Sequence, residues 1–175
     1  MAAIRHTIAI ASGKGGVGKS TTAVNLALGL KARGKAVGLL DADIYGPSAA
    51  LMLGVSPGTR PDTRNENTML PIVAHGIASM SMAYLASERT PMVWRGPMAG
   101  GALVQMLEQT DWGDLDYLIV DMPPGTGDVQ LTLCQRYQVT GAIVVSTPQD
   151  VALMDARRAA HALAELRGIS LWGSQ

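Results

Sequence analysis

The sequence of 175 residues predicts an α/β fold, in which a mostly parallel sheet is covered by helices on both faces. Short apolar runs typical of buried strands alternate with longer segments of helical periodicity. Glycine, proline and aspartate cluster between them, where turns are expected. The length fits one domain, and 47% hydrophobic residues are enough for a buried core.

The first half of the chain alternates regularly between the two kinds of element. Gly34 is expected as the C′ residue of the first helix, and Ser48 as the N-cap of a brief second helix. His75 and Gly76 are expected to turn one strand into the next. The predicted order is strand 7–11, helix 20–33, strand 36–40, helix 49–53, surface loop 54–67, and strands 70–74 and 77–82.

The second half continues the alternation, with Asp128 as the expected N-cap of its middle helix. The predicted order is helix 98–109, strand 117–120, helix 129–136, strand 142–146, helix 150–167 and the start of a strand at 169–172. Doubly wound domains usually continue beyond such a point. We therefore expect residues 1–175 to form a single domain that lacks its C-terminal strand and helix units.

The segment between the first strand and the first helix matches the pattern G-x-x-x-x-G-K-S/T, which binds nucleotide phosphates. Its glycines let backbone N–H groups converge on phosphate oxygens, and the new helix adds the positive end of its dipole. Lys19 supplies a mobile cation for the outer phosphates, and the Ser20 hydroxyl can ligate Mg²⁺. The alternative is a glycine-rich turn that merely contains lysine. The predicted nucleotide-binding residues of this loop are Gly13, Lys14, Gly15, Gly16, Val17, Gly18, Lys19, Ser20 and Thr21.

Aspartates follow two of the predicted strands, at the end of a parallel sheet where ligands bind. Asp121 is predicted to hold Mg²⁺, usually through water, because Mg²⁺ keeps several waters in its octahedral shell. Asp43 is predicted to orient the water that attacks the γ-phosphate, with Asp41 as an indirect Mg²⁺ ligand or structural partner. The alternative for Asp41 and Asp43 is capping of the turn before the next helix.

The segment Pro123–Gly127 combines stiff and permissive backbone immediately after Asp121. Such a segment can change position in response to the γ-phosphate, and Gly125 is predicted to contact the nucleotide. A rigid turn is the alternative from residue types alone.

Charge and composition argue against other function classes. The formal net charge is zero and there is no basic run, so nucleic-acid binding is not expected. We find no signal peptide and no apolar stretch near the roughly 18 residues of a membrane span, so no membrane association is expected. The single cysteine, Cys134, fits a reducing cytoplasm and is more typical of a small buried hydrophobe than of a nucleophile or ligand.

The loop G-K-G-G-V-G-K-S-T carries a second lysine, Lys14, which an ordinary phosphate loop does not need. It resembles the loop of the deviant P-loop ATPases, among them the MinD and ParA partitioning proteins and the Mrp/ApbC iron–sulfur carriers. In that group the extra lysine reaches across a dimer interface to the partner's nucleotide. The resemblance therefore implies a catalytic role for Lys14, beside Lys19 and Asp43. The alternative is a solvated loop lysine that raises the local positive potential.

Three further segments, D-A-D-I-Y-G-P-S, W-R-G-P-M and D-Y-L-I-V-D-M-P-P-G-T-G-D, make the chain similar to the Mrp/ApbC branch. The resemblance implies a three-layer P-loop NTPase fold. It also implies a cytoplasmic homodimer that binds and hydrolyses ATP with Mg²⁺ and passes a 4Fe–4S cluster to apo iron–sulfur proteins.

The family holds its cluster with a C-x-x-C pair in its C-terminal part. This chain contains no such pair and Cys134 does not match it, so the cluster ligands are absent from it. The alternative function is a MinD/ParA-like positioning switch. That function would need an amphipathic membrane-binding tail or a basic DNA-binding face, and the sequence shows neither.

Overall fold

The computed structural model describes residues 3–44, 46–85, 97–125, 127–165 and 170–172. Within them, the elements follow the order β1-α1-β2-α2-β3-β4-β5-β6-α3-α4-β7-α5-β8-α6-β9. The strands are β1 (Ile4–Ser12), β2 (Val37–Asp41), β3 (Thr63–Asn65), β4 (Thr68–Met69), β5 (Ile72–Ala74), β6 (Ile77–Ser81), β7 (Leu115–Asp121), β8 (Gly141–Val145) and β9 (Ser170–Trp172). The helices are α1 (Lys19–Ala32), α2 (Ala49–Met52), α3 (Met82–Leu85), α4 (Pro97–Gln109), α5 (Asp128–Arg136) and α6 (Asp150–Glu165).

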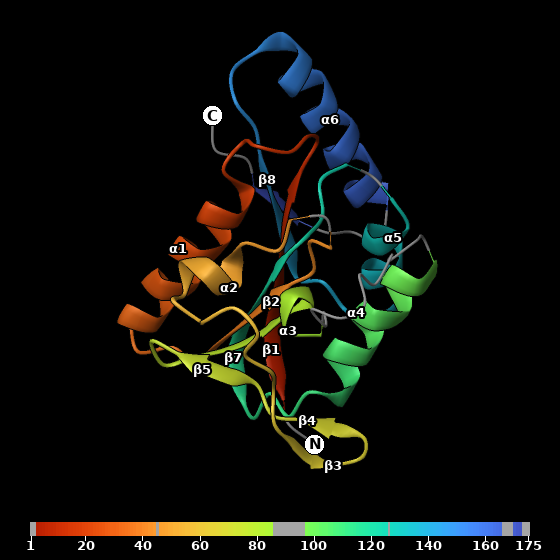
Figure 1. The fold of residues 1–175 in the computed structure, drawn as a ribbon. Coiled ribbons are helices and arrows are strands. Elements are labelled where there is room, and N and C mark those ends of the chain that lie inside the picture. The colour runs from red at the N-terminus through yellow and green to blue at the C-terminus, as the bar shows by residue number, and fades with distance from the viewer. Residues whose placement is uncertain (1–2, 45, 86–96, 126, 166–169, 173–175) are drawn as a thin grey trace.

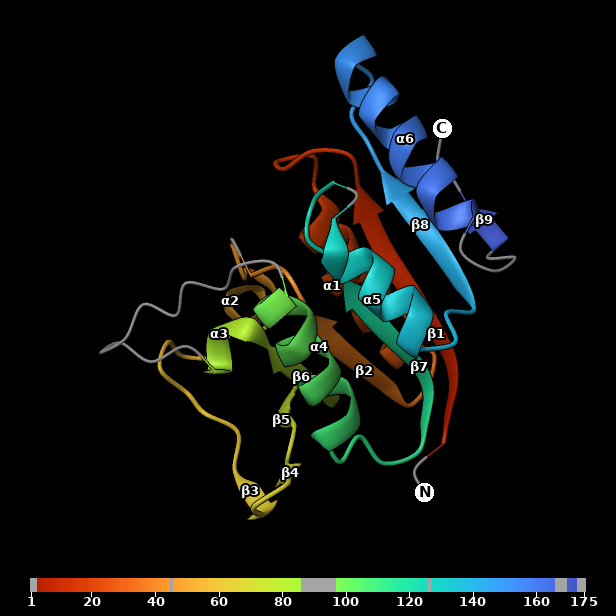
Figure 2. The same ribbon diagram turned by 90° about the vertical axis from the view of Figure 1, so that its right-hand side faces the viewer.

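The main sheet has the strand order β5-β6-β2-β7-β1-β8-β9 and is parallel except for the β5–β6 pair. Helices α1 and α2 cover one face, and α4, α5 and α6 cover the other (Figure 1). Turned by 90°, the molecule shows α4 and α5 in front of the sheet (Figure 2). The predicted α/β fold, a mostly parallel sheet with helices on both faces, is confirmed.

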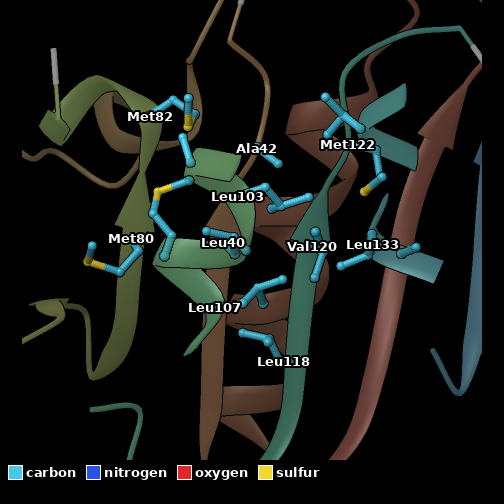
Figure 3. Close-up of a cluster of buried hydrophobic side chains, with 14 of the residues drawn as sticks. Leu40, Ala42, Met80, Met82, Leu103, Leu107, Leu118, Val120, Met122 and Leu133 are labelled. Atoms are coloured by element: carbon cyan, nitrogen blue, oxygen red, sulfur yellow. The ribbon is translucent and has the colours of Figure 1, made fainter. Parts of the chain in front are cut away.

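Burial on both faces of strand β7 explains the apolar run at its centre. Leu118 and Val120 lie in the core beneath α4 and α5, whereas Ile119 between them lies in the core beneath α1 and α2. All three are fully buried. Figure 3 shows Leu118 and Val120 packed with Leu103 of α4 and other aliphatic and methionine side chains. Because β7 has helices on both sides, neither of its faces needs polar residues.

Two turn predictions are confirmed by backbone geometry. Gly34 has a φ of 77° and donates its N–H to the carbonyl oxygen of Lys31 at 2.9 Å, which ends α1 as a C′ glycine does. His75 and Gly76, with φ of 52° and 74°, turn β5 into the antiparallel β6. Two successive residues in the left-handed region match the twist of a tight hairpin.

Two local predictions are wrong, that of the loop 54–67 and that of Asp128 as a helix N-cap, whereas that of Ser48 as the N-cap of α2 is confirmed. Residues 54–67 are not a loop throughout, because Thr63–Asn65 form β3 and pair with β4. Ser48 is the N-cap of α2 but makes no side-chain capping bond, and Asp41 accepts the N–H of Ala49. Helix α5 already includes Asp128, and its N-cap is Gly127. The segment Trp94-Arg95-Gly96 and the side chain of Cys134 lie outside the described part of the structure.

The parallel register brings the predicted site residues to one edge. Asp41, the last residue of β2, is paired with Asp121, the last residue of β7, and Ile10 of β1 is paired with Asp121 on its other side. The loop that follows β1 therefore starts beside both aspartates. No helix in the described part of the chain is both long and apolar enough to cross a membrane.

Candidate functional site

The glycine loop joins the end of β1 to the start of α1. Gly16 and Gly18 have φ of 76° and 90°, which other residues rarely adopt. Gly18 is the N-cap of α1 and offers no side chain to accept the first helical N–H groups. Those groups can therefore point at an anion, which the positive end of the helix dipole also favours.

A cavity of about 460 Å³ lies over this loop. Seven of the predicted site residues line it: Gly15, Gly16, Gly18, Lys19, Ser20, Thr21 and Asp43. Five lining residues were not predicted as site residues: Ser12, Gly46, Ser48, Met52 and Pro124. Gly46 and Ser48 belong to the segment D-A-D-I-Y-G-P-S, from which the sequence analysis took the family resemblance, the two aspartates and the helix cap, but no cavity-lining role for Gly46 or Ser48. The segment as a whole was the signal that could have found them.

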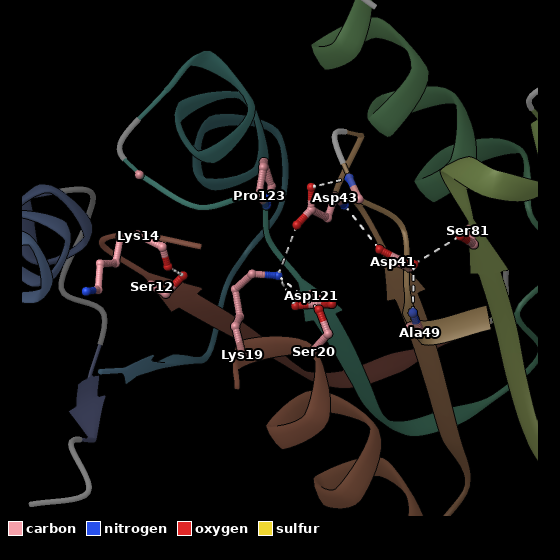
Figure 4. A network of polar contacts seen from close by, with 12 residues as sticks. Ser12, Lys14, Lys19, Ser20, Asp41, Asp43, Ala49, Ser81, Asp121 and Pro123 are labelled. Carbon is pink, nitrogen blue, oxygen red and sulfur yellow. Dashed lines mark hydrogen bonds and ion pairs between the residues drawn. The ribbon is translucent and has the colours of Figure 1, made fainter. Parts of the chain in front are cut away.

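Lys19 lies at the centre of a buried charge cluster (Figure 4). Its side chain is 7% exposed, and its Nζ is 2.5 Å from Oδ1 of Asp121 and 3.6 Å from Oδ2 of Asp43. It also contacts the Ser20 hydroxyl at 3.4 Å. One ammonium therefore faces two carboxylates from the ends of two neighbouring strands. An ammonium and carboxylates so far from water are costly unless they pair, and here they do.

Asp121 is only partly satisfied by this cluster. Its side chain is fully buried, and Oδ2 has no hydrogen-bond partner within the described structure. Burial raises the pKa of Asp121 above its ordinary value, although the charge of Lys19 and hydrogen bonds from Lys19 and Ser20 oppose the shift. An unpartnered carboxylate oxygen next to a serine hydroxyl is a donor set that suits a hard cation such as Mg²⁺.

Asp41 lies behind this cluster and is held by more partners. Its Oδ1 accepts the N–H of Asp43 at 3.2 Å, and its Oδ2 accepts the N–H of Ala49 and the hydroxyl of Ser81, each at 3.1 Å. Burial, with the charge of Asp121 as the next cause, raises the pKa of Asp41 to about 7. These bonds fix the turn that carries Asp43 and the start of α2. They match the structural role and the turn capping considered for Asp41.

Asp43 faces the cavity rather than the core. Its Oδ1 accepts the N–H of Gly46 at 3.3 Å, and its Oδ2 lies toward Lys19. Figure 4 shows Asp43 across the site from Ser20, with Lys19 between them. A carboxylate in this place is within the cavity that a nucleotide phosphate chain would enter, so it can act on a water molecule there.

The other predicted loop residues lie around the cavity rather than in its lining. The side chain of Lys14 extends away from Lys19 and Asp121 (Figure 4), and it makes no ion pair with any described residue. Gly13 packs against α6 so closely that a Cβ would collide with the backbone of Asp155. Gly125, with a φ of 91°, donates its N–H to the carbonyl oxygen of Ser12 at 2.8 Å. Pro124, its neighbour, lines the cavity.

Among the described residues, no three His, Cys, Asp or Glu side chains form a metal site by themselves. Mg²⁺ bound with a nucleotide needs only one or two protein oxygens, because phosphates and water supply the rest. Ser20 and Asp121 offer such oxygens at the start of α1. A glycine loop, a buried lysine and these oxygens, at the carboxyl edge of a parallel sheet, define a P-loop nucleotide-binding protein.

The family model of the ParA group described as NUBPL iron-transfer P-loop NTPases matches residues 3–172. The chain belongs to this family. It is 60% identical over 158 residues to an iron–sulfur cluster carrier protein of Pseudomonas fragi, covering 90% of this chain and 55% of that protein. It is 57% identical over 160 residues to the iron–sulfur cluster transfer protein NUBPL of Mus musculus, covering 90% and 50%. The chain thus spans about half the length of these relatives.

Solved structures agree with the fold. A nucleotide-binding protein from Archaeoglobus fulgidus, in complex with ADP, is 36% identical with a TM-score of 0.80, over 96% of this chain and 64% of that one. The cell division ATPase MinD of Pyrococcus furiosus has a TM-score of 0.70 over 96% of this chain and 70% of its own. MinD is only 22% identical, so the likeness shows a shared fold and carries no functional argument.

Proposed function

We propose that this chain binds ATP with Mg²⁺ and hydrolyses it, as the nucleotide-driven part of an iron–sulfur cluster carrier of Mrp type. The observation that carries the proposal is Lys19, buried at the bottom of the cavity between Asp121 and Asp43. A buried lysine with two carboxylate partners, at the start of a helix whose first amides face the same space, is arranged to hold a phosphate chain.

Different residues of the site are proposed to bind the phosphates, hold Mg²⁺ and orient the attacking water. Phosphate oxygens take hydrogen bonds from the loop N–H groups of residues 15–21, and Lys19 turns from its carboxylate partners to the outer phosphates. Ser20 and Asp121 are the residues that would hold Mg²⁺, which supplies charge neutralisation at the phosphates. Asp43 orients a water molecule in line with the γ-phosphate. These roles agree with the burial of Lys19 and Asp121 and with the place of Asp43 in the cavity lining.

The test is a calorimetric titration of the chain with ATP and with ADP, each with Mg²⁺ and with EDTA, followed by measurement of phosphate release. We expect both nucleotides to bind, more tightly with Mg²⁺, and phosphate to appear slowly from ATP only. Absence of binding to either nucleotide would contradict the assignment of the site.

We also propose that two copies of the chain act together, with Lys14 reaching the nucleotide of the partner copy. The support is the resemblance of the loop and the direction of the Lys14 side chain, which points away from Lys19 and Asp121 (Figure 4). Light scattering with and without ATP tests dimer formation. Lys14→Ala should lower hydrolysis and leave the affinity for ADP unchanged. Residence in the cytoplasm stays a prediction.

The cargo role is proposed from the relatives named as iron–sulfur cluster carriers, with apo iron–sulfur proteins as the recipients. A 4Fe–4S cluster is normally held by four cysteine thiolates. This chain has one cysteine, Cys134, so two copies supply two thiolates. We therefore expect anaerobic reconstitution of this chain with iron and sulfide to leave no broad visible absorption. A stoichiometric cluster that is lost in Cys134→Ser would contradict this expectation.

A further inference from the structure

Gln130 on the first turn of α5 is a buried polar residue with no role in the site described above. Its side chain is 5% exposed. The amide Nε2 donates both of its hydrogens to backbone carbonyl oxygens of the loop that follows β7, to Pro123 at 2.7 Å and to Gly125 at 2.9 Å. These contacts fix the orientation of the amide, because a flipped amide would point its oxygen at two carbonyl oxygens.

The Pro123–Gly125 loop has few backbone N–H groups with which to make hydrogen bonds of its own. Pro123 and Pro124 have no N–H, so they cannot donate backbone hydrogen bonds. The N–H of Gly125 is bonded to the carbonyl oxygen of Ser12, at the start of the glycine loop. Both Pro124 and Ser12 line the nucleotide cavity. Gln130 therefore supports one wall of the cavity from behind, without reaching the cavity itself.

The amide oxygen of Gln130, Oε1, is buried and left without a hydrogen-bond partner among the described residues, which costs folding free energy. An unsatisfied buried acceptor destabilises a fold, so it calls for an explanation. The two donated bonds to the loop supply one, since only a side chain with two N–H groups can bridge these two carbonyl oxygens from this position.

We propose that Gln130 is a positioning residue of the ATPase site, which fixes the Pro123–Gly125 loop against the glycine loop so that the cavity wall is preformed when the γ-phosphate enters. The proposal rests on the proposed function for its effect on hydrolysis. The two hydrogen bonds by which Gln130 fixes the loop are present without any nucleotide.

The first test uses the nucleotide-free protein and three variants. Gln130→Met keeps the length and removes both donors, and Gln130→Glu replaces the donors by oxygens. Gln135→Met is the control, because Gln135 is an exposed glutamine on the same helix. Amide hydrogen exchange is followed by NMR at Gly125, with Ile10 of β1 as the reference.

We expect Gly125 to exchange about tenfold faster in Gln130→Met and in Gln130→Glu, the effect of losing two neutral hydrogen bonds. Ile10 should exchange as before, and Gln135→Met should behave as the parent. Unchanged exchange at Gly125 in both Gln130 variants, or equal acceleration at Ile10, would overturn the proposal. The two Gln130 variants keep the test usable if one of them does not fold.

The second test separates positioning from a general loss of stability. In Gln130→Met we expect kcat for ATP to fall about tenfold, while the Kd for ADP and the KM for ATP stay within about twofold of the parent. If the parent itself binds no nucleotide, the proposed function fails, and the exchange experiment still decides the hold on the loop. If the parent hydrolyses ATP and Gln130→Met does so at the same kcat, the positioning role is contradicted.

Discussion

The two ends of strand β7 carry aspartates in opposite circumstances. Asp116 lies near the amino end, where its Oδ1 accepts a hydrogen bond from Arg5 at 3.1 Å and its Oδ2 accepts the N–H of Ala36 at 2.9 Å; its side chain is 26% exposed. Asp121, at the carboxyl end, is fully buried and leaves Oδ2 without a described partner. The hydrogen bond from Ala36 lowers the pKa of Asp116, whereas burial raises the pKa of Asp121.

The difference separates a carboxylate that serves the fold from one that serves a ligand. Both oxygens of Asp116 are used, and they join β7 to β1 and to the start of β2. Ionising Asp121 costs folding free energy, because its neighbours do not compensate fully for burial, which raises its pKa. A buried carboxylate with one oxygen that has no described partner lies beside the cavity, and a fully bonded carboxylate lies at the opposite edge of the sheet. This distribution is expected of a binding site on a stable fold.

The largest effect on nucleotide affinity is expected from Lys19→Ala, which removes the cation that pairs with Asp121 and Asp43. We expect the affinity for ADP with Mg²⁺ to fall at least about a hundredfold, because the phosphates lose a buried charge-assisted partner. Lys31→Ala is the matched control, since Lys31 is exposed on the same helix. Calorimetry measures both, with circular dichroism to check folding. Equal affinities in the two variants would exclude a phosphate role for Lys19.

A smaller effect is expected from Asp43→Asn. The variant removes the group proposed to orient water, so kcat should fall by about ten- to a hundredfold while the Kd for ADP changes little. Phosphate release and calorimetry on the same preparation measure the two quantities. An Asp43→Asn variant that turns over ATP at the parental rate would show that Asp43 has been given the wrong role.

A third prediction concerns the pH dependence of stability, because the pKa values of Asp41 and Asp116 are shifted in opposite directions. The pKa of Asp41 is raised from 3.8 to about 7, so the folded state binds the extra proton and the free energy of unfolding falls as pH rises between these values. Asp121 acts in the same direction. The lowered pKa of Asp116 has the opposite sign: its contribution is present above 3.8 and is lost as pH falls through its folded value.

Urea unfolding of the nucleotide-free protein in EDTA, from about pH 5 to about pH 8, measures this dependence. We expect stability to decrease with rising pH, and the decrease to be smaller in Asp41→Asn. Asp116→Asn should lower stability and keep the slope, because Asp116 does not titrate in that range. A slope that Asp41→Asn leaves unchanged would show that the charge of Asp41 is not the cause.

Much of this site could be predicted from sequence because its signals are local. The glycine loop and the aspartates that end β2 and β7 are contiguous with the strands that place them, and the parallel sheet then brings them together. The failures lie in irregular segments, where no hydrophobic period or motif marks the bonding partners although these are only a few residues apart. Ser48 is the N-cap of α2 as predicted, but its side chain makes no capping hydrogen bond. The hydrogen bonds from Gln130 to Pro123 and Gly125, and the pairing of β3 with β4, are contacts between near neighbours in sequence that no motif predicts.

The most direct test of the central claim compares Asp121→Asn with Asp116→Asn, the same change at the two ends of one strand. Each variant is measured for its free energy of unfolding without ligand and for its affinity for ADP with Mg²⁺. We predict that Asp121→Asn keeps or gains stability and loses the Mg²⁺-dependent part of the affinity, whereas Asp116→Asn loses stability and binds as the parent does. The reverse pattern, with Asp121 needed for folding but not for Mg²⁺-dependent binding, would contradict the claim that the carboxyl edge of the sheet is built for a nucleotide.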